Sequence, residues 1–204
     1  AADALMSIAS PAGARSVVAV GAYVSKMKWP SVDGHQYGFS VADSQPSGTL
    51  AYFSSVGPML DSTLLKPTVC APGFGIVSSI KEVGEYKNTN DLTVEKTTYS
   101  GANYFYGVMQ GTSQSSPVVA GVVALWLQAN PGLTYKEVTD IIRRSSTNDT
   151  HTGPTWNISW GYGKINAYEG IKLALQKATG IYRNVKSEMP VTVQKGPTEW
   201  KLLF

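Results

Sequence analysis

The sequence predicts an α/β protein, and three observations lead to that prediction. Residues 14–24 and residues 66–80 each contain a short, β-branched apolar run, which is typical of a buried strand. Residues 112–130 are apolar over the length of a helix, and further helical patterns follow them. Strands that alternate with helices indicate a layered α/β architecture.

The strands are predicted from composition and pattern. Residues 14–24 are apolar on both faces, which favours a strand in a parallel sheet. Residues 29–48 are rich in Gly, Pro, Ser and Asp, so they predict a loop or hairpin. Residues 49–58 predict a short strand that ends in a turn, and residues 66–80 predict a buried strand, a Pro-Gly turn and a second short strand. The polar, Tyr-rich residues 81–110 predict a surface excursion with short strands.

Three helices are expected in the second half. Residues 112–130 are apolar nearly all round, which predicts a buried central helix. Pro131 and Gly132 end it, and Thr134 with Glu137 forms a capping box for a second helix over residues 135–145. A last helix is expected over about residues 166–178.

Composition bounds the class of protein. The 204 residues suffice for one domain, alone or with a small appendage. The net charge is +3, and the scattered Lys and Arg residues form no basic stripe, so no nucleic-acid partner is expected. The longest apolar run, residues 118–127, is too short for a membrane span. Cys70 is the single cysteine and lies in an apolar phrase, which predicts a buried, inert thiol.

Ser113 is the candidate nucleophile. A serine in the first turn of a helix can attack a carbonyl with its Oγ, while its backbone N–H points at the developing oxyanion. Gly111 before it lets a substrate backbone approach closely. The alternative is that Thr112 or Ser113 only caps a core helix. The segment is not the nucleophile elbow of α/β-hydrolases, because the residue two places after Ser113 is a serine and not a glycine.

A longer pattern surrounds Ser113. The phrase GTSQSSPVVAGVVAL, residues 111–125, closely resembles the nucleophile motif of subtilisin-like serine peptidases, of the form Gly-Thr-Ser-x-x-x-Pro-x-Val-Ala-Gly. Three further phrases resemble the same family in the same order: SVVAVGA, FSSVGP with KPTVCAPG, and WGYGKINAYEGI. Together the resemblance covers about residues 9–180.

The resemblance implies a fold and a set of roles. Residues 1–180 would be the C-terminal portion of a subtilisin-like catalytic domain, a three-layer fold with a mostly parallel sheet and a buried central helix. Residues 181–204 would be a linker and the start of a β-rich extension. Ser113 would be the nucleophile and an oxyanion donor, with Thr112 as a hydrogen-bonding residue beside the oxyanion hole. Ser10–Pro11 would form a cis-proline turn near the floor of the specificity pocket.

A Ser-His-Asp triad also needs a base, and the chain has two histidines, His35 and His151. Both are expected in surface loops, beside Asp33 and Asp149. In the family, an Asp, a His in a His-Gly-Thr phrase and an oxyanion Asn come before the Ser, and neither histidine here has that context. The resemblance therefore implies that those segments lie upstream of Ala1 and that this chain alone is inactive.

Such a chain would expose apolar faces and an open sheet edge. We therefore expect association with the missing N-terminal half or with a second copy. The resemblance also implies a peptide or protein substrate and a secreted, periplasmic or cell-surface parent protein. Calcium is common in the family, but no ligands for it are assigned here and no other cofactor is expected.

Other interpretations stay open at this point. One alternative is a catalytically dead, subtilisin-like scaffold for binding or assembly. An unrelated α/β binding domain with a capped helix would require four ordered motif matches to be accidental. The aromatic residues just before Gly111 would either line a substrate cleft or lie on a surface hairpin; they are Tyr99, Tyr104, Phe105 and Tyr106.

Overall fold

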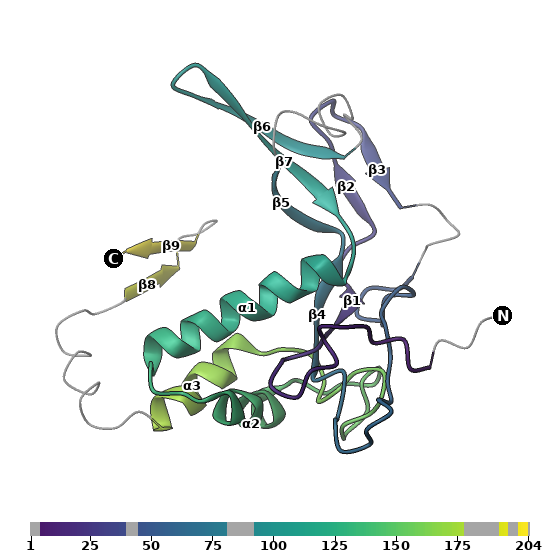
Figure 1. Cartoon of the computed structure of the whole chain (residues 1–204). Coiled ribbons are helices and arrows are strands. Elements are labelled where there is room, and N and C mark those ends of the chain that lie inside the picture. The colour runs from purple at the N-terminus through teal and green to yellow at the C-terminus, as the bar shows by residue number, and fades with distance from the viewer. Residues whose placement is uncertain (1–4, 40–44, 81–91, 178–191, 196–199, 204) are drawn as a thin grey trace.

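A computed structural model of the chain describes residues 5–39, 45–80, 92–177, 192–195 and 200–203 (Figure 1). Its centre is a parallel pair of strands, β1 (Val20–Val24) and β4 (Val69–Phe74), in which Val20 lies opposite Val69. Both strands are largely buried, so the predicted buried parallel strands are confirmed. Isolated bridges extend the pair on both edges, from Tyr23 to Leu50 and from Cys70 to Lys164.

Two details of the strand prediction are wrong. Residues 49–58 form no strand beyond the single bridge at Leu50. The chain then turns, and the Ser54 Oγ accepts a hydrogen bond from the Ala22 N–H at 3.0 Å. The expected Pro-Gly turn is part of β4, where the register shifts in a bulge. The chain turns at Gly75 instead, where φ is +75° and a Cβ atom would lie 2.3 Å from the Lys26 carbonyl oxygen.

The remaining strands in the first 110 residues are antiparallel. The hairpin of β2 (Lys28–Pro30) and β3 (Gln36–Gly38) lies within the expected loop. A second sheet has the order β5-β7-β6. Its members are β5 (Ile76–Ile80), β6 (Thr93–Tyr99) and β7 (Ala102–Met109). Figure 1 shows this sheet extending away from the β1–β4 pair, which agrees with the predicted surface excursion.

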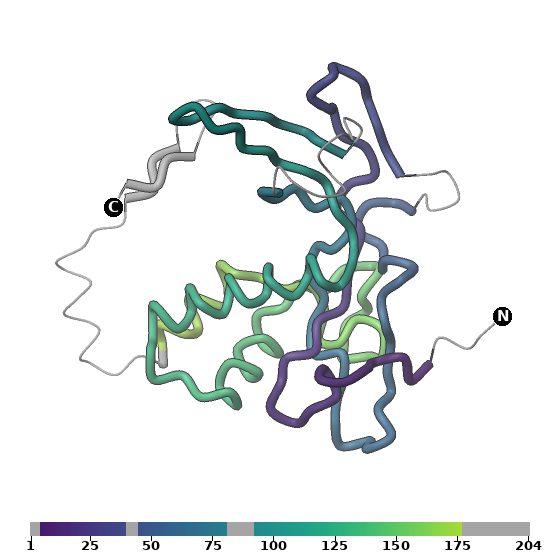
Figure 2. Tube along the Cα trace, turned by 45° about the horizontal axis from the view of Figure 1, so that its top comes forward, coloured from purple at the N-terminus to yellow at the C-terminus, as the bar shows by residue number. Residues whose placement is uncertain are grey.

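The three predicted helices are present as α1 (Thr112–Ala129), α2 (Tyr135–Ser145) and α3 (Ala167–Lys177). They lie together beside the β1–β4 pair (Figure 1, Figure 2). The capping box of Thr134 and Glu137 is formed in both directions, as predicted. The α/β class is thus confirmed, although the parallel pairing between named strands is confined to β1 and β4 in the described residues.

The core lies between the helices and the parallel pair. Trp126 on α1 is fully buried, and its indole N–H donates to the Ala167 carbonyl at 3.1 Å. The cluster around it consists of Val69, Ala71, Val119, Val138, Ile141, Ile142 and Ala174. Cys70 is buried and burial raises the pKa of its thiol to about 12, which supports the predicted inert role.

α1 is buried on one side only, unlike the central helix that its apolar sequence predicts. Its buried residues are Ser115, Val119 and Trp126, whereas Leu125 is 51% exposed and Leu127 is 36% exposed. No residue of this helix carries a charge. The sheet and α3 contact one side of α1, and nothing in the described part of the chain covers the other. This open face of α1 is therefore an apolar surface.

Near the C-terminus, β8 (Thr192–Lys195) pairs antiparallel with β9 (Trp200–Leu203). The proposed linker after residue 180 falls largely outside the described residues. The division at residue 180 therefore stays a prediction.

Candidate active site

The predicted nucleophile segment lies where β7 ends and α1 begins. The Gly111 N–H donates to the Gly73 carbonyl at 2.7 Å, which ties this turn to the carboxyl end of β4. Gly111 is the N-cap of α1, and no side chain caps the helix. Thr112 and Ser113 are therefore helical residues, and the interpretation that either one only caps α1 is not what the structure shows.

Ser113 is the second residue of α1 and is exposed. Within the described residues, neither its hydroxyl nor its N–H has a hydrogen-bond partner. The free N–H groups and the positive end of the helix dipole favour negative charge at this position. A free hydroxyl can attack a carbonyl carbon, and a free N–H beside it can bind the oxyanion that forms.

The neighbouring serines on α1 have different environments. Ser115 is fully buried, and its Oγ donates to the Ala71 carbonyl at 3.3 Å. Ser116 is exposed, but its Oγ donates to the Thr112 carbonyl at 3.0 Å. Of the three, Ser113 is thus the one whose hydroxyl is unengaged in the described structure.

Two glutamines flank Ser113 and were not singled out from the sequence. The Nε2 of Gln114 donates to the Met109 sulfur at 3.6 Å. The Oε1 atoms of Gln114 and Gln110 are buried and lack a partner among the described residues. A buried, unpaired acceptor is unfavourable unless something donates to it. No sequence signal separates these side chains from other loop amides, because their orientation is set by the fold.

The structure does not bring either histidine to Ser113. His35 is exposed on the β2–β3 turn, and its Nδ1 lies 3.4 Å from an oxygen of Asp33 on the same turn. His151 is exposed in the turn after Asp149, and its ring lies close to Gly48. In the described residues, no hydrogen bond or ion pair joins either imidazole to Ser113. Both histidines are therefore in surface turns, as predicted.

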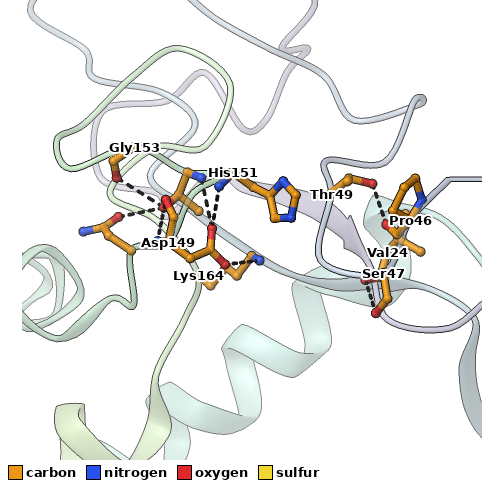
Figure 3. Close-up of polar contacts among 10 residues, drawn as sticks. Val24, Pro46, Ser47, Thr49, Asp149, His151, Gly153 and Lys164 are labelled. Atoms are coloured by element: carbon orange, nitrogen blue, oxygen red, sulfur yellow. Dashed lines mark hydrogen bonds and ion pairs between the residues drawn. The ribbon is translucent and has the colours of Figure 1, made fainter.

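The turn that carries His151 is held by an ion pair (Figure 3). The Nζ of Lys164 lies 2.7 Å from Asp149. It also lies 5.0 Å from the ring centroid of Tyr23 and 5.3 Å from that of Trp160. The hydrogen bond from Lys164, helped by the N–H groups of His151 and Thr152, lowers the pKa of Asp149 to about 2. Asp149 therefore orders this turn and does not orient a catalytic imidazole: its carboxylate binds the backbone N–H of His151.

This ion pair predicts an acid-dependent loss of stability. Because the pKa of Asp149 is lowered from 3.8 to about 2 on folding, its contribution is present above pH 4 and is lost as the pH falls toward 2. Asp149→Asn should reduce the dependence of the free energy of unfolding on pH in that window. Urea unfolding at several pH values measures this, and Lys164→Gln should give a smaller reduction, because the N–H groups of His151 and Thr152 still bind Asp149. An unchanged pH dependence in both variants would contradict the assignment.

The Ser10–Pro11 peptide bond is cis, as expected for the predicted turn. Nearby, Met6 and Ile8 line an apolar cavity of about 380 Å³. The cavity is also lined by Pro58, Met59, Leu60, Asp61 and Leu64. A role for this turn in substrate specificity stays a prediction.

The described ranges contain neither a candidate metal site nor a candidate membrane-spanning helix. No group of three or more His, Cys, Asp or Glu side chains there is arranged to hold a metal ion, so no ligands for calcium can be named. None of the described helices has both the length and the apolar character needed to cross a bilayer.

Comparisons with known proteins agree with this geometry. A model of the subtilase family matches residues 2–163. The serine protease AprX of Bacillus subtilis is 33% identical over 164 residues, which cover 80% of this chain and 31% of AprX. Pyrolysin of Pyrococcus furiosus is 32% identical over 166 residues, which cover 76% of this chain and 10% of pyrolysin.

Solved structures show the same fold. The CspB protease of Clostridium perfringens superposes with a TM-score of 0.56 at 19% identity, over 85% of this chain and 30% of that protein. A protease of Pseudoalteromonas arctica superposes with a TM-score of 0.50 at 25% identity, over 81% of this chain and 38% of that protein. The chain thus spans about a third of the length of AprX and of these two structures.

Proposed function

The chain belongs to the subtilase family of serine peptidases, and from that premise we propose that it supplies the nucleophile of a peptide-bond hydrolase. One observation carries the proposal. Ser113 stands at the start of α1 with its hydroxyl and N–H unengaged in the described residues, while Gly111 serves as the helix cap. Thr112 would be a hydrogen-bonding residue beside the oxyanion hole.

The proposed reaction is acyl transfer. Ser113 Oγ attacks the substrate carbonyl carbon while a histidine base takes the hydroxyl proton, and the Ser113 N–H binds the oxyanion. The C–N bond then breaks, the histidine returns its proton to the leaving amine, and an acyl-serine remains. Water, deprotonated by the same histidine, hydrolyses this ester and restores Ser113. Gly111 has no side chain to obstruct the substrate backbone.

The proposed reaction needs a base for the Ser113 hydroxyl, and no described residue that contacts Ser113 can supply it. We propose that the Asp, His and Asn segments of the fold lie in the rest of the catalytic domain, which covers the open face of α1. The absence of any charge on α1 and the exposure of Leu125 and Leu127 support such a partner. The alternative is that a second copy of the chain covers this face.

The site of action proposed for the parent protein is extracellular, in agreement with the similarity to a Bacillus subtilis relative named minor extracellular protease Vpr, 38% identical over 89 residues. The second candidate function is that of a catalytically dead scaffold. The observation that favours it is that neither His35 nor His151 contacts Ser113 in the described structure.

Serine-directed labelling tests the proposal. We expect the 204-residue chain alone neither to hydrolyse a fluorogenic peptide nor to react with a fluorophosphonate, because no base contacts the Ser113 hydroxyl in the described residues. The same chain within the full open reading frame should do both. Labelling of the isolated chain that Ser113→Ala abolishes would contradict the need for a second half. An unlabelled full-length protein would favour the scaffold.

A further inference from the structure

The β5-β7-β6 sheet exposes an apolar row on one face. Side chains alternate across a strand, so Tyr104 and Tyr106 of β7 point to the same face. Tyr99 pairs with Ala102 and Val77 pairs with Val108, which places both side chains on that face too. The exposed fractions are 39% for Val77, 73% for Tyr99, 47% for Tyr104 and 40% for Tyr106. We call these four residues the tyrosine face.

The other face of the sheet is different. There the ring of Phe105 is half-buried, with the Lys96 ammonium 5.6 Å from its centroid. On the tyrosine face the charged residue paired with a tyrosine is Glu95, opposite Tyr106. All exposed large apolar side chains described in residues 76–109 therefore gather on one side of this sheet.

The spacing of Tyr104 and Tyr106 along β7 matches that of an extended polypeptide. Alternate residues of a strand lie about 6.6 Å apart, which is also the separation of alternate side chains in an extended ligand. Tyrosine rings pack against aliphatic and prolyl side chains, and their hydroxyls exchange hydrogen bonds with peptide groups. The tyrosine rings would thus make apolar contacts with every second side chain of the ligand. Their hydroxyls would hydrogen-bond to the peptide groups between those side chains.

The C-terminal end of β7 connects the tyrosine face to the candidate active site. β7 ends at Met109, four residues before Ser113, and both Figure 1 and Figure 2 show β7 and α1 diverging from their junction. From Tyr104 to Met109 the strand rises about 17 Å, the length of about five extended residues. Val108, on the same side of β7 and between the tyrosines and this junction, is 2% exposed, so on β7 the exposed part of the face ends at Tyr106.

We propose that the tyrosine face binds an extended segment of the substrate polypeptide about five or more residues from the bond that Ser113 attacks. This inference rests on the proposed peptidase function. It predicts a preference for long, unfolded substrates, since short peptides would fill the site at Ser113 without reaching the tyrosines.

The test compares long and short substrates in the full-length protein. In the double variant Tyr104→Thr and Tyr106→Thr, the KM for reduced, carboxymethylated α-lactalbumin should rise about tenfold, with kcat unchanged. Hydrolysis of a fluorogenic tetrapeptide should be unaffected. The matched control is Tyr52→Thr with Tyr168→Thr, two tyrosines that are 57% and 70% exposed elsewhere. This control should leave both substrates unchanged.

Binding to the 204-residue chain provides a second measurement. Fluorescein-labelled, carboxymethylated α-lactalbumin should bind about tenfold more weakly to the tyrosine variant, and equally to Ser113→Ala and to the chain without substitutions. Equal binding by the tyrosine variant would overturn the proposal. The proposal would also be overturned if sedimentation showed that the chain forms a dimer and that the tyrosine variant alone abolishes it. A second copy of the chain would then be the partner that covers the tyrosine face. An inactive full-length protein that still binds through the face would refute the peptidase function separately.

Discussion

Replacing Ser113 with alanine in the full-length protein is expected to lower kcat on the order of a million-fold, the magnitude known from subtilisin for loss of the triad serine. The reason is that Ser113 offers the unengaged hydroxyl at the start of α1 in the described structure. The KM for a short peptide should change little, because the substrate-binding backbone stays in place. Stopped assays with a fluorogenic peptide, over several enzyme concentrations, measure the residual rate.

Ser116→Ala is the matched control, since this exposed serine lies one helical turn further along α1. Its hydroxyl already donates to the Thr112 carbonyl. Substitutions at such exposed positions usually change stability little, so kcat should stay within about twofold. A comparable loss of kcat in both variants would mean that the damage is to the helix and not to a nucleophile.

Replacing Trp126 with alanine is expected to lower the free energy of unfolding by about 3–5 kcal/mol, the usual cost of emptying a buried aromatic site. Trp126 is fully buried, and its indole N–H bonds to the Ala167 carbonyl. A Cβ atom at Gly170 would lie 1.9 Å from the ring, so α3 fits tightly against it. Urea unfolding followed by circular dichroism provides the measurement.

Leu125→Ala is the control for that experiment. Leu125 is next to Trp126 on α1 but is 51% exposed, so its truncation should cost well under about 1 kcal/mol in the isolated chain. In the full-length protein the cost should rise to about 2 kcal/mol or more if the rest of the domain covers the open face. Equal costs in the two proteins would contradict that arrangement.

The sequence was sufficient where structure depends on local chemistry. The buried strands at residues 14–24 and 66–80 follow from β-branched apolar runs, and both are present in part. The helix over residues 135–145 follows from a cap, an amphipathic face and a preceding break, and it is present with those bounds. Ser113 was predicted as the nucleophile from a motif whose spacing is strict, and that role stays a prediction.

Other features depend on which segments meet in space. Pro72 and Gly73 usually predict a turn, but here Gly111 bonds to the Gly73 carbonyl and the strand continues to Phe74. The apolar sequence of α1 indicates burial, but burial is set by what covers the helix and not by the helix itself. The same limit applies to the tyrosine face, because sharing a face requires the register of β5, β6 and β7.

The parallel pairing at the centre has a consequence for folding. Five side-chain hydrogen bonds between residues 7–25 and residues 56–74 all join positions separated by 49 residues. Most of the β1–β4 register has the same offset. One loop closure therefore brings all of these contacts within reach, and the length-dependent part of its free-energy cost, about 3.4 kcal/mol at this loop length, is incurred once for the whole set. We expect the two segments to assemble in a single cooperative step whose rate is limited by chain search, as is usual for long-range pairing.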